Sequence, residues 1–64
     1  MNKDAELYAE ALASGEPTSY SGVAARLAWD LGRAALAEAE VRRAGKIKYD
    51  NVGRGRLLLP DQDK

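Results

Sequence analysis

Three stretches of this 64-residue chain place apolar side chains at the spacing of an α-helix. The first helix is expected over about residues 4–14, with an apolar face of Leu7, Tyr8, Ala11 and Leu12. The second is expected over about residues 20–28, with Val23, Ala24 and Leu27 on one face. The third, over about residues 31–44, has a longer and mainly apolar face of Leu31, Ala34, Ala37, Glu38, Val41 and Ala44. We expect these faces to pack against one another as the core.

Polar residues and glycines mark where the three helices begin and end. The candidate N-caps are Asp4 for the first helix, Ser19 or Ser21 for the second and Asp30 for the third. Gly15 and Gly45 follow the first and third helices, and glycine readily takes the left-handed conformation that stops a helix. The stretch "SGEPTSYS" between the first two helices indicates a break in regular structure.

After Gly45 the apolar period changes to two, which is typical of a strand. Ile47 and Tyr49 alternate with lysines, "DNVG" supplies turn residues, and the chain can return as a second strand before Pro60. We expect a hairpin over about residues 46–59 and a disordered tail over 60–64. Its inward side chains would be Ile47, Tyr49, Leu57 and Leu59, and its thin basic tip would hold Gly53, Arg54, Gly55 and Arg56. The sequence thus predicts one mainly α domain, with three helices and a small β-hairpin.

Composition excludes several classes of protein. The chain has no cysteine and no histidine, so it has no disulfide bond, and neither a zinc site nor a catalytic constellation is expected. No apolar run reaches the roughly 20 residues that span a bilayer. Lys3 is not followed by the hydrophobic segment of a signal peptide. We therefore expect a cytoplasmic protein that is not an enzyme, binds no cofactor, metal or small molecule, and does not contact a membrane.

Ten basic and ten acidic side chains cancel over the whole chain but are unevenly distributed. Residues 1–21 carry one lysine against four carboxylates, a net charge of −3. Residues 22–59 carry eight cations against four carboxylates, a net charge of +4, and the last five residues have a net charge of −1. A contiguous basic segment favours nucleic acid, because a partner at the surface responds to the local field. The alternative is that these charges only solvate helix faces.

The stretch "VAARLAWDLGRAALAEAEVRRAGKI" resembles the winged helix-turn-helix superfamily of DNA-binding domains. The positions that match its pattern are Val23, Ala24, Leu27, Ala28, Trp29, Asp30, Ala44, Gly45 and Ile47. A basic hairpin follows where the wing of that superfamily stands, so the resemblance covers roughly residues 20–60. Two shorter stretches, "LYAEA" at 7–11 and "GRAA" at 32–35, are similar to the C-terminal gamma domain of FtsK-type DNA translocases.

The resemblance implies a small bacterial or phage transcriptional regulator, or a DNA-reading module, that binds double-stranded DNA with a sequence preference. Its third helix would enter the major groove, where the first residues of a recognition helix meet the base edges. The base contacts would be Gly32, Arg33 and Leu36, because arginine can bind guanine bidentately and leucine can contact a thymine methyl group. The backbone and wing contacts would be Ser19, Ser21, Lys48, Asn51, Arg54 and Arg56, with Arg26 and Arg43 as additional contacts. A unit this small is expected to bind as a homodimer, in tandem or within a larger protein assembly.

Two side chains of the third helix fit DNA binding less well. Glu38 falls on the inward face, where a carboxylate needs a partner, and Arg26 or Arg54 could supply one. Leu36 falls on the outward face, where it could anchor another protein as well as a base. A rotated or shifted third helix would remove both anomalies. Trp29 is expected to cover the turn and pack on the third helix. The second hypothesis is therefore a winged helix that binds a protein partner without binding DNA directly.

Overall fold

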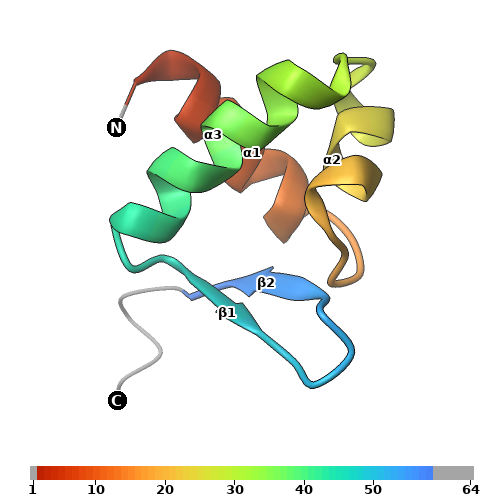
Figure 1. Ribbon diagram of the computed structural model, residues 1–64, viewed down its shortest axis with the longest axis vertical. Helices are drawn as coiled ribbons and strands as arrows, with labels where there is room; N and C mark the ends of the chain where they lie inside the picture. The colour runs from red at the N-terminus through yellow and green to blue at the C-terminus, as the bar shows by residue number, and fades with distance from the viewer. Residues whose placement is uncertain (1, 59–64) are drawn as a thin grey trace.

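The computed structural model describes residues 2–58, which form three helices and then a two-stranded hairpin (Figure 1). The elements are α1 (Lys3–Ala13), α2 (Tyr20–Leu27), α3 (Leu31–Arg43), β1 (Ile47–Tyr49) and β2 (Gly55–Leu57). The predicted fold class is confirmed: the protein is mainly helical with a small antiparallel hairpin, an architecture compatible with a small winged helix. Within residues 2–58, no helix is long and apolar enough to cross a membrane. The tail expected at 60–64 lies outside the described residues.

The first turns of α1 and α3 are closed by side-chain caps, but the cap of α1 is not the expected one. Asn2 precedes α1, and its Oδ1 accepts from the N–H group three residues further on at 2.8 Å. Asp4 lies inside the first turn instead, because the helix begins one residue earlier than the acid that was expected to cap it. The prediction for α3 is confirmed, since Asp30 Oδ1 accepts from the Arg33 N–H group at 2.7 Å.

The three helices end in different ways. α2 ends at Ala28, which takes the left-handed conformation with φ of 57° and turns the chain towards α3. Beyond α3, Gly45 is left-handed with φ of 74°, as predicted. Gly15 does not act as such a stop, because α1 ends through Ser14 in the right-handed region and Gly15 has no positive φ. A Cβ at Gly15 would lie 2.8 Å from Cζ of Arg26, so this glycine makes room for the guanidinium.

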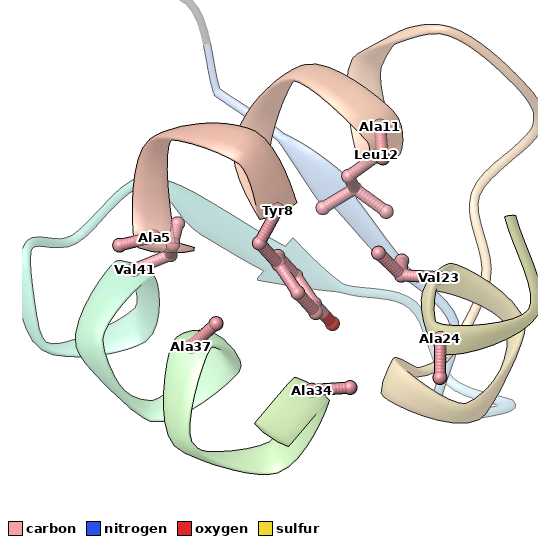
Figure 2. Close-up of a cluster of buried hydrophobic side chains, with 9 residues drawn as sticks. All are labelled: Ala5, Tyr8, Ala11, Leu12, Val23, Ala24, Ala34, Ala37 and Val41. Atoms are coloured by element: carbon pink, nitrogen blue, oxygen red, sulfur yellow. The ribbon is translucent and has the colours of Figure 1, made fainter. Parts of the chain in front are cut away.

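The core is a cluster of nine buried side chains to which all three helices contribute (Figure 2). Its members are Ala5, Tyr8, Ala11 and Leu12 from α1, Val23 and Ala24 from α2, and Ala34, Ala37 and Val41 from α3. Five of the nine are alanines, so the helices can approach closely around Tyr8, which is the largest of the fully buried side chains. Burial, with the charge of Glu38 nearby, raises the pKa of Tyr8 to about 12.

Three residues predicted to be in the core lie outside it, and one of them is Leu7 of α1, which is only half-buried. Leu31 is 56% exposed, and Ala44 is also exposed. Leu31 is the first residue of α3 and Ala44 is its C-cap, so both lie at the ends of the helix. Helical spacing indicates the direction of a side chain, but not how far along a helix its neighbours reach. The half-buried side chains that do pack against the core are Leu27, Trp29, Ile47 and Leu57.

A residue between α1 and α2 extends the hairpin. The register within the hairpin pairs Ile47 with Leu57, Lys48 with Arg56 and Tyr49 with Gly55. Thr18 bridges to Gly55 on the other side of β2, through N–H···O distances of 3.1 and 2.9 Å in the two directions. The sequence did not predict this bridge, which ties the hairpin to the helical layer. In Figure 1 the hairpin runs beneath the helices, and its tip points to the side on which α2 begins.

Gly55 and Arg56 do not belong to the hairpin tip, contrary to expectation. Both lie in β2, and the connection between the strands is residues 50–54. Gly55 is buried, and a Cβ there would lie 3.0 Å from both Ile47 Cγ2 and the ring of Tyr49. Glycine is needed at this position because the Tyr49 ring packs across β2, and not because the tip must be flexible.

The inward side of the hairpin is as predicted at Ile47 and Leu57, but Tyr49 is not buried. Ile47 and Leu57 pack against the core, while Tyr49 covers Gly55 and stays 41% exposed. Leu59, the fourth inward residue that was expected, lies outside the described residues.

Glu38 makes the polar contact between α3 and the hairpin. Its side chain is only 12% exposed, its Oε2 accepts from the Tyr49 hydroxyl, and the same oxygen lies 3.4 Å from Arg42 Nε. The inward position is as predicted, but the expected partners are wrong. Arg26 donates to carbonyl groups at the α1–α2 connection, and Arg54 binds within the hairpin. The partners of Glu38 come instead from the next turn of its own helix and from β1.

Candidate nucleic-acid interface

The outward face of α3 combines a short apolar strip with the exposed side chains of Arg33 and Arg43. Gly32 and Leu36 are exposed there, with Ala35 and Ala39 half-buried beside them at helical spacing. Leu36 is 77% exposed, so its predicted outward direction is confirmed. Leu31 adds a second exposed leucine at the start of the helix. Apart from Arg33, the residues expected to meet DNA bases are therefore small or apolar, which allows a partner to approach the helix closely.

Arg33, the expected base reader, is engaged within the protein. Its Nε and Nη2 donate to the two carboxylate oxygens of Asp4, each at 2.9 Å. Its guanidinium carbon lies 4.1 Å from the centre of the Trp29 ring, a cation–π contact. The hydrogen bonds to Arg33 hold the pKa of Asp4 below its ordinary value, and Asp4 raises the pKa of Arg33. We call this contact the Asp4–Arg33 pair.

Sequence reasoning missed both partners of Arg33. Asp4 and Arg33 are 29 positions apart, and nothing in their spacing indicates a contact. Trp29 was expected to cover the turn, and it does pack against the core while also supporting the guanidinium. The pair therefore joins the first turn of α1, the α2–α3 turn and the first turn of α3.

Two cations of the predicted wing set lie side by side on the outer face of the hairpin. Lys48 and Arg56 are directly opposite each other in the register, and both side chains are exposed. Because side chains alternate along a strand, they point away from the face on which Ile47 and Leu57 meet the core. Neither makes an ion pair with an acid of residues 2–58.

A hollow of about 170 Å³ brings the basic residues of the hairpin together. It is lined by Pro17, Lys48, Tyr49, Asp50, Arg54 and Arg56. Three of the predicted backbone contacts thus share one surface, next to the connection between α1 and α2. Asp50 is the single acid among the lining residues. Among residues 2–58 there is no group of three or more acidic side chains that could hold a metal ion.

The tip of the hairpin is closed by Asp50. Its Oδ1 accepts from the N–H groups of Val52 at 3.0 Å and Arg54 at 2.9 Å, and its Oδ2 lies 3.2 Å from Arg54 Nε. The backbone N–H of Arg54 is the first cause of the lowered pKa of Asp50. Gly53 takes φ of 86° in this turn, and Asn51 is exposed beside it. Asp50 thus partly neutralises the charge of the Arg54 side chain. Asn51 is uncharged, so it could contact a partner only through hydrogen bonds.

The remaining predicted contacts have structural partners. The hydroxyl groups of Ser19 and Ser21 lie 2.8 Å apart at the start of α2, and Ser19 occupies the N-cap position without a side-chain cap bond. Arg26 donates from Nη1 to the Ala11 carbonyl at 3.1 Å and from Nη2 to the Glu16 carbonyl at 2.7 Å. This arginine therefore closes the α1–α2 connection.

Arg43, the other additional contact, belongs to the end of α3. Its Nη2 donates to Oε1 of Glu40 at 2.8 Å, an ion pair one turn apart on the helix surface. Its charge is therefore partly balanced by its own helix.

No family profile, curated protein or solved structure matches the chain.

Proposed function

We propose that the protein binds double-stranded DNA as a winged helix-turn-helix module, in the cytoplasm of a bacterium or a phage-infected cell. In this proposal α3 enters the major groove, with Gly32 and Leu36 facing the bases, and the hairpin follows the DNA backbone. The order of three helices and a hairpin supports it. The module would serve as a small transcriptional regulator or as the DNA-reading part of a larger machine.

The observation that carries the proposal is the pair of cations on the hairpin, Lys48 and Arg56. They are directly opposite in the register, and like charges in that position repel each other. Neither has an acidic partner within residues 2–58 that would offset the repulsion. A phosphate group placed between them would replace repulsion by attraction, and phosphate contacts of this kind orient a protein on a duplex.

The small residues at the start of α3 would let DNA approach the helix closely, but they add no electrostatic attraction. Gly32 and the neighbouring alanines leave the helix slim, and exposed Leu36 can contact a thymine methyl group. One copy offers only a small contact area for DNA, since single modules of this kind bury less surface than specific dimers do. A second copy or a tandem module would therefore be needed for tight binding.

Salt titration of duplex binding tests the proposal. Affinity should fall steeply with salt, because each neutralised phosphate releases condensed counterions. Lys48→Gln and Arg56→Gln should weaken binding to all sequences alike and reduce the slope against the logarithm of salt concentration by about 1 each. Lys3→Gln is the matched control, because it removes the same charge at the exposed start of α1. It should leave the slope unchanged.

Two results would reject binding of DNA through the hairpin. One is the absence of duplex binding by the wild-type chain at low salt. The other is an equal loss of affinity in the Lys3 control and the hairpin variants, which would indicate attraction by total charge rather than by the hairpin.

Binding of a protein partner is the second candidate, and the exposed leucines of α3 favour it. Leu31 and Leu36 are 56% and 77% exposed, while the cation between them is engaged by Asp4. In that case the wild-type chain should not bind duplex DNA, and Leu36→Ser should abolish association with a second copy, as measured by sedimentation. Loss of duplex binding in the same variant would instead support α3 in the groove.

A further inference from the structure

Arg33 is the cation best placed on α3 to reach a base, yet its guanidinium is bound elsewhere in the free protein. Two of its N–H groups donate to Asp4, and its plane lies over Trp29. The Nε and Nη2 edge that Asp4 occupies is one of the edges with which arginine binds carboxylates, phosphates or guanine bidentately. Arg33 therefore cannot offer this edge to DNA while the Asp4–Arg33 pair is closed.

The pair is built so that it can open. The Arg33 and Asp4 side chains are 47% and 38% exposed, and exposed ion pairs contribute little because water and salt compete with them. Asp4 is not the N-cap of α1, a role that Asn2 fills, so its carboxylate is not required to start the helix. Trp29 supports the guanidinium from one side without hydrogen bonding to it.

We infer that Asp4 is a positioning residue that competes with DNA for Arg33 and so sets how readily Arg33 reads a base. This inference rests on the proposed function. The exchange is between two acceptors of one guanidinium: the Asp4 carboxylate in the free protein, and a guanine edge or a phosphate in the complex. Binding to DNA must then displace Asp4, and any change that weakens the Asp4–Arg33 pair should strengthen the complex.

Asp4→Asn tests the inference, with Glu6→Gln as the matched control. Both substitutions remove one negative charge from the first turn of α1, but only Asp4 contacts Arg33. Asp4→Asn should bind duplex DNA about 1.5- to fivefold more tightly than Glu6→Gln, the range in equilibrium constant that exposed ion pairs span. In an Arg33→Ala background the two substitutions should have equal effects, because the competition has been removed.

Nuclear magnetic resonance of the Arg33 Nε–H group provides a test that needs no substitution. In the free protein this resonance should be protected from exchange with water by Asp4, and addition of duplex DNA should shift it. An unchanged Arg33 signal in a complex that shifts the Lys48 and Arg56 signals would overturn the inference.

The outcomes separate this inference from the function on which it rests. If neither the wild-type chain nor Asp4→Asn binds duplex DNA, both are rejected. If the wild-type chain binds and Asp4→Asn binds no better than Glu6→Gln, DNA binding stands and the competition by Asp4 is rejected. Competition by Asp4 is also rejected if Asp4→Asn still binds duplex DNA more tightly than Glu6→Gln in the Arg33→Ala background.

Discussion

The two ends of α3 are attached to the rest of the molecule by polar contacts of different kinds. At the N-terminal end, Arg33 binds Asp4 at the surface, where both side chains are well exposed. Towards the C-terminal end, Glu38 is nearly enclosed and binds the Tyr49 hydroxyl and Arg42. Removing a carboxylate from water is costly, so an enclosed one requires its partners, whereas an exposed pair can exchange them. The first end is therefore suited to exchange with a ligand, and the second end holds the hairpin in place.

The strongest test of this difference breaks the C-terminal contact without touching Glu38. Gly55→Val would place a side chain where even a Cβ lies 3.0 Å from the Tyr49 ring and from Ile47 Cγ2. The ring must move away, so we expect Tyr49 to leave Glu38 and the free energy of unfolding to fall by about 2 to 3 kcal/mol. Urea unfolding measures the loss, and the Tyr49 ring signals report the displacement.

Arg56→Val is the control for that substitution. It places the same side chain at the next position of β2, on the exposed face of the hairpin. We expect its free energy of unfolding to change by less than about 0.5 kcal/mol, as for other surface positions. Equal losses in the two variants would contradict the packing of Tyr49 over Gly55.

A smaller effect is expected when the charge of Glu38 is removed directly. Glu38→Gln keeps the size of the side chain and an acceptor for Tyr49, but it ends the ion pair with Arg42. We expect a loss of about 1 kcal/mol, because a hydrogen bond to a charged group becomes an ordinary one. Glu40→Gln removes the same charge from a more exposed ion pair with Arg43, and should cost less than about 0.5 kcal/mol. If the two variants lost equal stability, the enclosure of Glu38 would have no energetic consequence.

The same contrast explains which parts of the structure the sequence could predict. Contacts within one element follow from spacing or residue type, as with the Asp30 cap, left-handed Gly45 and the buried stripe of α3. The prediction that Leu31 is buried failed. The residue pattern of one helix does not show how far the neighbouring helices extend along it. The prediction that Asp4 caps the first helix also failed, because Asn2 is the N-cap and the Asp4 carboxylate binds Arg33 on α3.

The candidate site was less predictable than the fold. The sequence identified Lys48 and Arg56 as wing cations, but it placed Arg56 at the tip and not opposite Lys48. Pairing register decides which charges become neighbours. In this register Tyr49 pairs with Gly55, where a larger side chain would meet the ring. The partners of Arg33 depend in the same way on the packing of α1 beside α3.

Acid should weaken the exposed pair before it affects the packing of the core. The pKa values of Asp4 and Asp50 lie below the ordinary 3.8, so the folded protein keeps both groups ionised where the unfolded chain binds protons. The stability that they contribute is therefore complete well above pH 3.8 and is lost as the pH falls through the folded pKa values. We expect urea unfolding midpoints to decline between about pH 4 and pH 2, and to decline less in Asp4→Asn. An unchanged pH profile in that variant would contradict the Asp4–Arg33 pair.

The smallest change in stability is expected at the start of α3, and it is a gain where the other variants lose stability. Gly32→Ala adds a methyl group whose nearest neighbour would be Asp30 Oδ1 at 3.5 Å, an ordinary contact. Alanine favours a helix over glycine, so the free energy of unfolding should rise by up to about 1 kcal/mol. Gly53→Ala is the control of opposite sign, because φ of 86° at the hairpin tip is strained for alanine. If the Gly32 variant gains stability but loses duplex affinity, the methyl group lies in the DNA interface; if affinity is unchanged, the start of α3 does not enter the groove.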